Sequence, residues 1–478
     1  MNPRSVAATV LAAGMAFLGG CASTAEQEAF SELGRSGRAS GAASTRPAEG
    51  PRETDLPEKA DLSDYLSFAA LHNPGLEAAF ARWKAALERI PQARSPDDPR
   101  FTYRHFIVAQ AMRDGDMRNT FEISQMFPWF GKLELRGDIA TREARAAQQR
   151  FEMERLKLYN RVKQAYYEHY YLSRAIAVAQ ENVQQLKHIE DAARARYAAA
   201  AGSQADLIRA QVELGKLENE LRSLEDLRGP TVAKLNAALN RPADAKVPTP
   251  GPIAEDGADL TDRQLSAWLS ESNPELKGMD FDVAREKLAV ELARKDYFPD
   301  VMVGFEIDQM SRGPGMANDE MNPPLALMVS LNIPIWWEKY AAGVREAKAR
   351  YWAAQRDKTE KANSLGADLK MAAYNCRNAQ RKIALYRDTL LPKARQSLKS
   401  IQVEYQTGKA SFTDLIDAQR ILLEFQLSHE RALADRQQAL AEMEMIVGRP
   451  LSGAAEQKAG GAVAPPAGGG KEKGDERR

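Results

Sequence analysis

The sequence has little of what marks several large protein classes. Its 478 residues include only two cysteines, which rules out a framework of disulfides. Lysine plus arginine and aspartate plus glutamate each number 66, so the formal net charge is zero and the basic excess of a nucleic-acid-binding protein is missing. After the first twenty residues, no run approaches the roughly 18 apolar residues of a membrane-spanning helix.

Signatures of catalysis are also lacking. The chain has no glycine-rich dinucleotide motif, no P-loop and no zinc-protease motif. Its five histidines are scattered, without a cysteine or histidine partner at the spacing of a metal site. We therefore predict that the protein is not an enzyme and that it needs neither a cofactor nor a bound metal ion.

The N-terminus has the pattern of a secretory signal, because Arg4 precedes a short apolar stretch from Ser5 to Phe17. Leu18-Gly19-Gly20-Cys21 then resembles a bacterial lipobox, in which the cysteine is lipidated and becomes the first residue of the mature chain. We predict a signal peptide over residues 1–20 and a lipid anchor such as palmitate on Cys21. The alternative is an ordinary signal peptide in which Cys21 occurs by chance.

The two ends of the mature chain are poor in apolar periodicity. Residues 21–60 carry the lipidated cysteine and read as a flexible tether that is rich in serine, alanine, glycine and charged residues. Residues 451–478 consist of glycine, alanine and proline runs followed by charges, and they predict a disordered tail.

Between these ends the sequence repeats itself. Asn73-Pro74-Gly75-Leu76 recurs as Asn273-Pro274-Glu275-Leu276 at an offset of 200, and Phe127-Pro128-Trp129 recurs as Ile333-Pro334-Ile335-Trp336 at about 206. Further matches occur at an offset of 208, and they pair Tyr197 with Tyr405, Asp206-Leu207 with Asp414-Leu415, Ala210-Gln211 with Ala418-Gln419, and Asn240-Arg241-Pro242 with Gly448-Arg449-Pro450. We interpret residues 61–250 and 258–450 as two copies of one unit.

Each copy has the same expected order of elements. A short helix ends before Asn-Pro, and a second helix runs to about Ile90 or Asp296. Two strands follow, and then a very long helix, over about 131–199 and 338–406, with a return helix over about 204–238 and 412–447. Apolar residues at alternating steps of three and four predict a coiled-coil seam, which is formed by Leu172, Ile176, Ala179, Val183 and Leu186 in the first copy.

The strands of the second copy alternate strictly between apolar and polar or small residues, over 301–308 and 325–333. Their length is close to that of a tilted membrane-spanning strand. Aromatic residues cluster where strands meet helices, which is typical of a membrane–water interface, and the clearest are Trp129, Phe130, Trp336 and Trp337. A soluble hairpin packed on helices is the alternative.

Four strands per chain are too few to close a barrel, and open strand edges have no hydrogen-bond partners in lipid. Several copies must therefore pool their strands. Two chains would supply eight strands and three would supply twelve, and the arithmetic does not choose between them.

At this point the chain resembles the TolC-type outer-membrane factors of tripartite export systems, over roughly residues 61–450. The duplicated strand–strand–long-helix layout carries the resemblance. Local motifs reinforce it, namely Ala70-Leu71-His72-Asn73-Pro74-Gly75-Leu76, Ile123-Ser124-Gln125-Met126-Phe127-Pro128-Trp129-Phe130-Gly131-Lys132, and Tyr405-Gln406-Thr407-Gly408 with Ser411. The Phe-Pro-Trp-Phe-Gly-Lys stretch is most similar to the heavy-metal branch that serves resistance-nodulation-division pumps.

The resemblance implies a mainly α fold with a membrane β-barrel part: a homotrimer with a twelve-stranded barrel in the outer membrane and a coiled-coil tunnel through the periplasm. It also implies that the two helix–turn–helix tips face a periplasmic adaptor. Matching positions at these tips predict a gate formed by Tyr405, Gly408, Ser411, Asp414, Asp417, Gly202 and Asp206. An alternative is that Asp414 only complements the dipole of a helix start. The first tip departs from the family pattern, because Ala200 stands where glycine is expected and Arg209 stands where the second copy has Asp417.

The function expected from the resemblance is a passive exit duct for metal ions or small toxic compounds, which an inner-membrane pump and an adaptor deliver. The expected location is the outer membrane, with a lipid anchor and a periplasmic extension. One alternative is the outer-membrane part of a type I protein secretion system. An alternative of another class is a lipid-anchored periplasmic coiled-coil adaptor or scaffold.

Overall fold

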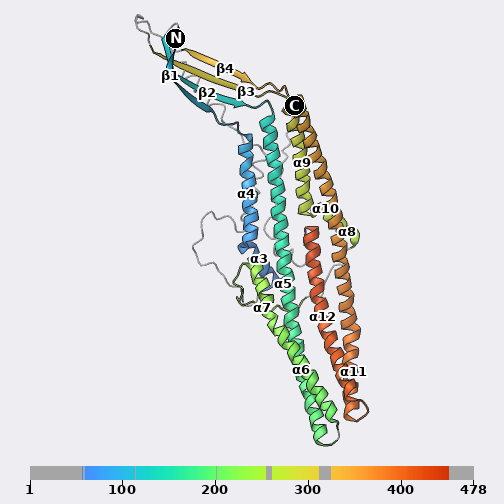
Figure 1. Ribbon diagram of the computed structural model, residues 1–478. Coiled ribbons are helices and arrows are strands. Elements are labelled where there is room, and N and C mark those ends of the chain that lie inside the picture. Colours follow the sequence, from blue (N-terminus) through green and yellow to red (C-terminus); the bar gives the residue numbers. More distant parts are fainter. Residues whose placement is uncertain are drawn as a thin grey trace, which may run out of the picture. The chain divides into compact units, whose positions relative to one another are not determined.

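A computed structural model describes residues 56–57, 60–112, 115–200, 202–253, 261–311 and 324–451. Cys21, the predicted signal peptide, and nearly all of the predicted tether and tail lie outside these residues. The described chain is mainly helical and contains one four-stranded sheet (Figure 1). This confirms the predicted fold class of a mainly α protein with a β part.

The order of elements repeats, as predicted. The first copy consists of α3 (Leu62–His72), α4 (Pro74–Arg94), β1 (Arg100–Met112), β2 (Gly115–Phe127), α5 (Lys132–Ala198), α6 (Gln204–Asp226) and α7 (Arg228–Leu239). The second copy consists of α8 (Asp262–Ser272), α9 (Pro274–Lys295), β3 (Val301–Ser311), β4 (Leu325–Leu331), α10 (Trp337–Leu385), the π-helical turn η1 (Tyr386–Leu390), α11 (Leu391–Gln406) and α12 (Phe412–Val447).

Two helices that the sequence predicts as continuous are interrupted in the structure. The long helix of the second copy contains the π-helical turn η1 just before Pro392, and the return helix of the first copy breaks at Leu227, three residues before Pro230. Proline has no N–H to donate to the preceding turn and its ring crowds the carbonyl four residues back, so the α-helical hydrogen-bond pattern shifts at such sites. Strand β4 ends at Leu331, two residues earlier than predicted.

Internal contacts divide the described residues into two compact units. One unit contains residues 75–152 and 274–363, and the other contains the remaining described residues. Each unit takes parts from both sequence copies, because α5 and α10 continue from one unit into the other. The sheet belongs to the first unit, and both turns between long and return helices belong to the second.

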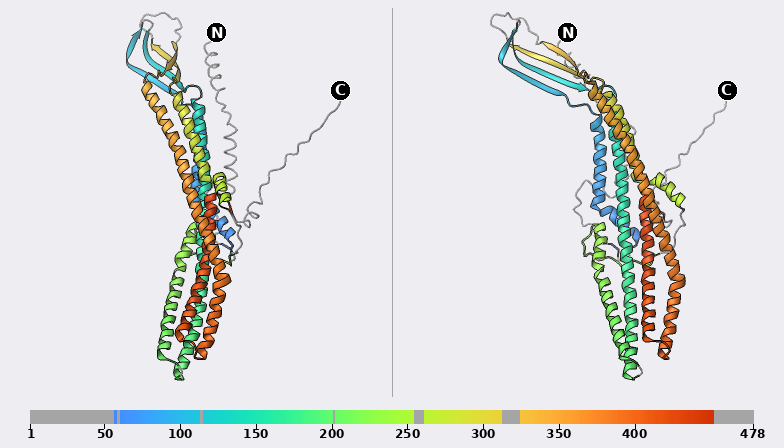
Figure 2. Two further views of the ribbon diagram at one scale, coloured as in Figure 1. Left: turned by 90° about the vertical axis from the view of Figure 1, so that its right-hand side faces the viewer. Right: turned by 45° about the vertical axis from the view of Figure 1, so that its right-hand side comes forward.

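The sheet has the order β1-β2-β3-β4, and all neighbours are antiparallel (Figures 1 and 2). The register brings apolar residues of all four strands into continuous rows on one face. One row consists of Tyr103, Phe121, Ile307 and Leu325, and the next consists of Phe101, Ile123, Phe305 and Leu327. These side chains remain between 38% and 67% exposed, so no other part of the described chain covers this apolar face.

The opposite face of the sheet is polar. Glu122 and Glu306 are direct cross-strand neighbours there, and the Thr120 hydroxyl donates to the Asp308 carboxylate at 2.6 Å. Like charges directly opposite each other on a sheet are destabilising in a dry environment. The two faces therefore suit different surroundings, one apolar and one aqueous.

A buried lysine joins the two copies below the sheet. Lys132, the first residue of α5, is 3% exposed, and its Nζ lies 2.9 Å from the carboxylate of Asp300, just before β3. Asp300 also accepts the amide N–H of Trp129 at 2.8 Å. Burial by itself raises the pKa of Asp300, but the hydrogen bonds from Lys132 and Trp129 outweigh it and hold the pKa below its ordinary value.

The second unit has the predicted helical seam. Leu172, Ile176, Ala179, Val183 and Leu186 are all buried, and Val183 and Leu186 belong to a core that also includes side chains of α6, α11 and α12. Across this seam, Gln419 on α12 donates to the side-chain oxygens of Asn182 and Gln185 at 2.7 and 2.8 Å. Apolar residues supply the packing free energy, and paired polar groups of this kind favour one register over others.

The internal duplication is visible in a repeated hydrogen bond of the second unit. Asn73 donates from Nδ2 to the carbonyl of Ala238, and Asn273 donates to the carbonyl of Ile446, at 3.0 and 2.7 Å. Each asparagine stands immediately before the proline that begins α4 or α9, and each acceptor lies in the last turn of a return helix. In both copies, this hydrogen bond therefore joins the end of the return helix to the start of the second helix.

The ion pair below the sheet generates a prediction about acid stability. We expect Asp300→Asn to lower the free energy of unfolding by about 1–3 kcal/mol at pH 7, because Lys132 then loses its nearest buried charge partner. The depressed pKa of Asp300 means that its contribution is present above the ordinary pKa of about 3.9 and is lost as the pH falls through the lower folded value. Thermal unfolding of the detergent-solubilised protein, followed by circular dichroism between pH 7 and pH 2, measures both effects.

The exposed Asp357 on α10 provides the matched control, and Asp357→Asn should leave the unfolding midpoint nearly unchanged. An Asp300→Asn variant that unfolds like the wild type at every pH would contradict the role of the Lys132–Asp300 pair.

Candidate functional site

The two turns that join long helices to return helices lie at the same end of the second unit (Figure 2). Gly408 has a φ of 77° in the second turn, and Ala200 has a φ of 57° in the first. Both residues are thus in the left-handed region, which glycine adopts freely and which is strained for alanine by roughly 1–2 kcal/mol. Ala200 therefore takes the conformation that the sequence comparison assigns to glycine.

Ser411 and Asp414 form a reciprocal cap at the start of α12. The Asp414 amide donates to the Ser411 hydroxyl oxygen at 3.2 Å, and the Asp414 carboxylate accepts the amide of Ser411 at 3.0 Å and its hydroxyl at 2.7 Å. These hydrogen bonds from Ser411 lower the pKa of Asp414. The carboxylate is therefore ionised near neutral pH, and it remains exposed to solvent while it caps the helix.

Asp417 lies one turn further along α12 and is also exposed. Its carboxylate forms an ion pair with Arg420 on the same helix. An exposed pair at this spacing contributes little to stability and rearranges easily. Both acidic residues of the second turn thus reach solvent, one as a cap and the other in a surface ion pair.

Tyr405 occupies a different environment, because it is only 8% exposed. Its ring lies against Phe412 with centroids 5.7 Å apart, and the guanidinium of Arg196 lies 4.6 Å from the ring centre. Arg196 also donates to the Tyr405 carbonyl at 2.5 Å. Burial raises the pKa of the Tyr405 hydroxyl, which stays protonated, and the side chain connects the two turns.

The first turn is built differently from the second. Gly202 lies against the end of α5, where a Cβ would come within 3.0 Å of the Arg196 Cβ. Ser203 caps α6 by accepting the Ala205 amide at 3.1 Å, and Asp206 follows in the first turn of the helix. A side chain at Gly202 would therefore crowd the end of α5.

The structure therefore places all the predicted gate residues at one end of the second unit. Asp414 and Asp417 are solvent-exposed there, whereas Tyr405 is packed between helices. Two arginines that the sequence analysis did not select connect the turns: Arg196 contacts Tyr405, and Arg209 donates to the hydroxyl of Thr413. Arg209 stands where the second copy has Asp417, and this difference between the copies is the only signal for it in the sequence.

The predicted interface aromatics lie in the first unit, where strands pass into helices. Trp129 stacks on Phe298 with ring centroids 5.4 Å apart and also contacts Phe130. Phe130, Trp336 and Trp337 are between 65% and 82% exposed, so large aromatic surface is available below the apolar face of the sheet. This is the arrangement that indole and phenyl rings adopt at a membrane–water boundary.

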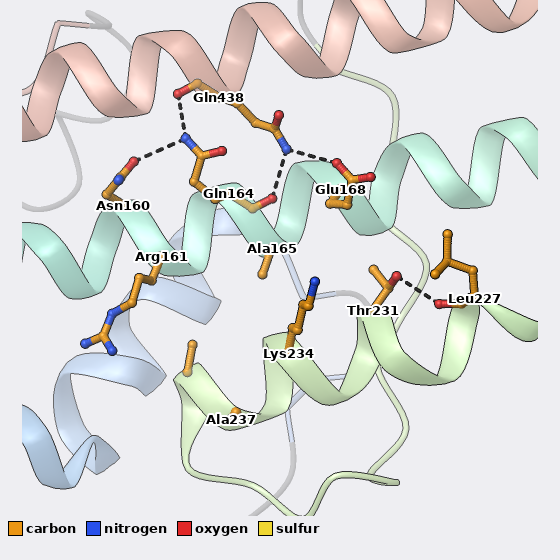
Figure 3. A pocket seen from close by; sticks show the side chains of 11 residues that line it. Asn160, Arg161, Gln164, Ala165, Glu168, Leu227, Thr231, Lys234, Ala237 and Gln438 are labelled. Carbon is orange, nitrogen blue, oxygen red and sulfur yellow. Dashed lines mark hydrogen bonds between the residues drawn. The ribbon is translucent and has the colours of Figure 1, made fainter. Parts of the chain in front are cut away.

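A groove of about 680 Å³, lined by both polar and apolar side chains, lies in the second unit between α5, α7 and α12 (Figure 3). Gln164 and Gln438 each donate to the other's backbone carbonyl across it, at 2.9 and 3.1 Å, and Gln438 also reaches Glu168 at 3.2 Å. The two glutamine amides thus hold α5 and α12 together, and they do not form a catalytic arrangement. Nowhere in the described residues do three or more His, Cys, Asp or Glu side chains converge as metal ligands.

None of the described helices combines the length and apolar composition that a membrane-crossing helix needs.

Comparison with known proteins identifies the family. The family model described as outer membrane efflux protein matches residues 66–241 and 266–449, which together make up most of the chain. Among curated proteins, the chain is similar to the cobalt-zinc-cadmium resistance protein CzcC of Cupriavidus metallidurans, with 24% identity over 412 residues, covering 84% of this chain and 92% of CzcC.

Solved structures show the same fold. The outer membrane protein VceC from Vibrio cholerae matches with a TM-score of 0.70 and 19% identity, over 82% of this chain and 97% of VceC. CusC matches with a TM-score of 0.70 and 15% identity, over 85% of this chain and 98% of CusC. The chain therefore belongs to the outer membrane efflux protein family, and it is an outer-membrane efflux channel of the TolC type and not an enzyme.

Proposed function

We propose that three copies of this chain form the passive exit duct of a tripartite efflux system. The observation that carries the proposal is the four-stranded sheet, which within the described ranges has an uncovered apolar face and two unpaired edges, β1 and β4. In lipid, the N–H and C=O groups of such edges need partners, and only a closed barrel supplies them. Three copies supply twelve strands, with the apolar rows toward lipid and Glu122 and Glu306 toward water.

In this proposal the four-stranded sheet lies in the outer membrane and the helices extend into the periplasm. The two helical turns contact a periplasmic adaptor, and an inner-membrane pump of the resistance-nodulation-division type supplies the energy. The similarity to CzcC supports divalent metal ions as the cargo, with small toxic compounds as the broader class. A duct of this kind needs no catalytic residue, because the pump performs the energy-consuming step.

Deletion of the gene tests this function. We expect a deletion strain to lose tolerance to cobalt, zinc and cadmium salts while its protein secretion is unchanged, and plasmid-borne wild type should restore tolerance. Loss of a secreted protein with unchanged metal tolerance would instead identify the duct of a type I secretion system. Planar-bilayer recordings of the purified protein address the scaffold alternative, because an adaptor or scaffold gives no conductance.

We propose further that the second helical turn forms the narrow periplasmic entrance of the duct. Asp414 and Asp417 from three chains would place six exposed carboxylates around it, and carboxylates in a confined mouth favour cations. Tyr405, Gly408 and Ser411 shape and cap this turn, and Gly202 and Asp206 shape the neighbouring one. Arg196 and Arg209 hold the two turns together.

The entrance proposal predicts a change in ion selectivity. Replacing Asp414 and Asp417 by alanine should reduce the ratio of cation to anion permeability by a factor of about three to ten at low salt, because an exposed carboxylate contributes on the order of 1 kcal/mol to a nearby cation in water. Reversal potentials of single channels in a salt gradient measure this ratio.

A control separates charge from helix capping. Ser411→Ala removes the cap that Asp414 shares but keeps both carboxylates, so it should leave the permeability ratio near the wild-type value. Unchanged currents and selectivity in the Asp414→Ala, Asp417→Ala double variant would remove both residues from the entrance.

We also propose that Cys21 carries the lipid anchor, because it ends the lipobox-like sequence. Cys21→Ser should abolish labelling by radioactive palmitate, whereas Cys376→Ser, which alters the other cysteine, should not. The barrel should keep the unacylated variant in the outer membrane, since one acyl chain contributes less than the pooled strands. Persistent palmitate labelling of Cys21→Ser would show that the anchor lies elsewhere.

A further inference from the structure

We infer that neighbouring copies join along one defined seam, in which Gln355 and Trp352 on α10 of one copy pack against Ala78 on α4 of the next, and Leu331 of β4 pairs with Phe101 of β1. This inference rests on the proposed trimer and specifies which residues of each copy meet. The surface that accepts the second copy is the α10–β4 side of the first unit, and the surface presented to it is the α4–β1 side.

The template for the seam is an interface within the chain. In the first unit, α9 of the second copy lies against α5 of the first copy, and Gly278 marks the close approach. A Cβ built on Gly278 would lie 3.4 Å from the Cβ of Gln149 and 3.8 Å from the carbonyl oxygen of Ala146. One turn away, Arg150 of α5 forms an ion pair with Asp282 of α9 at 2.9 Å.

Because the chain is duplicated, the same kind of interface is expected between α10 of one copy and α4 of the next. Along the long helices the offset is 206, and Gly137, Gln149 and Arg150 correspond to Gly343, Gln355 and Arg356. Between the shorter helices the offset is 200, so Gly278 corresponds to Ala78. The counterpart of the Gln149–Gly278 contact is therefore Gln355 of one copy against Ala78 of the next, since no described segment of the same chain contacts α10 and α4 in this way.

The side chains on these two surfaces complement each other. Trp352 corresponds to Ala146, and it is 60% exposed although it is a large apolar residue. On α4, the residues that would receive it are small and exposed, namely Gly75, Ala78, Ala81 and Ala85. A large ring against a row of small side chains buries apolar area that each copy leaves in contact with water.

The inferred seam lacks the ion pair that its template contains. Arg82 stands where the template has Asp282, so Arg356 cannot form the ion pair that Arg150 forms. Arg356 instead lies over the ring of Trp352, with its guanidinium carbon 4.7 Å from the ring centre. Apolar packing by Trp352 thus replaces an ion pair at the contact between copies.

The same transfer fixes the register of the edge strands. Within the chain, Phe101 pairs with Ile123, Val303 pairs with Val329, and Gln125 pairs with Val303. At the offset of 206, Ile123 corresponds to Val329, and Gln125 corresponds to Leu331. Phe101 is the partner of Ile123 and Val303 is the partner of Val329, so Phe101 corresponds to Val303. Leu331 therefore pairs with Phe101 of the next copy, which keeps both residues on the apolar face.

Disulfide cross-linking of the full-length protein tests the seam. In a Cys376→Ser background, the double variant Ala78→Cys, Gln355→Cys should form covalent dimers and closed trimers on mild oxidation, because a Cβ separation near 3.4 Å in the template is close to that of a disulfide. Non-reducing gels of outer membranes show these species, and reduction removes them. Each variant that carries only one of the two introduced cysteines should remain monomeric on the gel.

Two matched pairs sharpen the result. Gly278→Cys with Gln149→Cys, the template pair, should lose its free thiols without any increase in mass. Leu331→Cys with Phe101→Cys should link copies, whereas Leu331→Cys with Tyr103→Cys, two residues out of register, should link them much less. Because the strand pair does not alter α4 or α10, it remains informative when the helix pair disturbs folding.

The outcomes separate this inference from the proposed duct. A trimer in detergent, measured by light scattering, that forms neither the Ala78–Gln355 nor the Leu331–Phe101 link would overturn the seam and leave the trimer standing. A preferred Leu331–Tyr103 link would overturn the register. A monomeric protein in detergent would instead overturn the trimeric duct itself.

Discussion

The organisation of this protein depends on the backbone groups at the two edges of its sheet. Among the residues that the structure describes, β1 and β4 each have one side without a strand partner, and the apolar face of the sheet is left uncovered. In a membrane, an unpaired N–H or C=O group is more costly than any side-chain contact can offset. In the proposed duct, further copies complete these hydrogen bonds, and the exposed apolar rows face lipid.

The two sequence copies are joined to each other and closed by specific polar contacts. Lys132 and Asp300 join the two copies below the sheet, and Asn73 and Asn273 close each copy with equivalent hydrogen bonds in the helical unit. Two differences between the copies lie in the inferred seam. Trp352 replaces Ala146, and Arg82 replaces Asp282, at positions that face outward from the chain.

The helical turns combine a rigid scaffold with exposed charge. Tyr405 is held by Arg196 and Phe412, and Ser411 fixes the first residues of α12. Asp414 and Asp417 reach solvent from this scaffold, and in the proposed entrance their charge acts on a passing ion without a change in the fold. Buried contacts fix the position of the turns, and exposed carboxylates supply their charge. This combination suits the proposed passive duct in a family of efflux channels.

The sequence by itself determined the repeated order of elements, the alternation of the strands and the seam of α5, because spacing of apolar residues reports local periodicity and burial. It did not show the break at Leu227, the π-helical turn before Pro392, or the partners of Arg196 and Lys132. Those features depend on which distant segments come together: Arg196 and Tyr405 are 209 residues apart, and Lys132 and Asp300 are 168 apart. Only the tertiary structure sets such pairs, since a hydrogen bond or ion pair requires atoms within about 3 Å and local sequence periodicity carries no information about that distance.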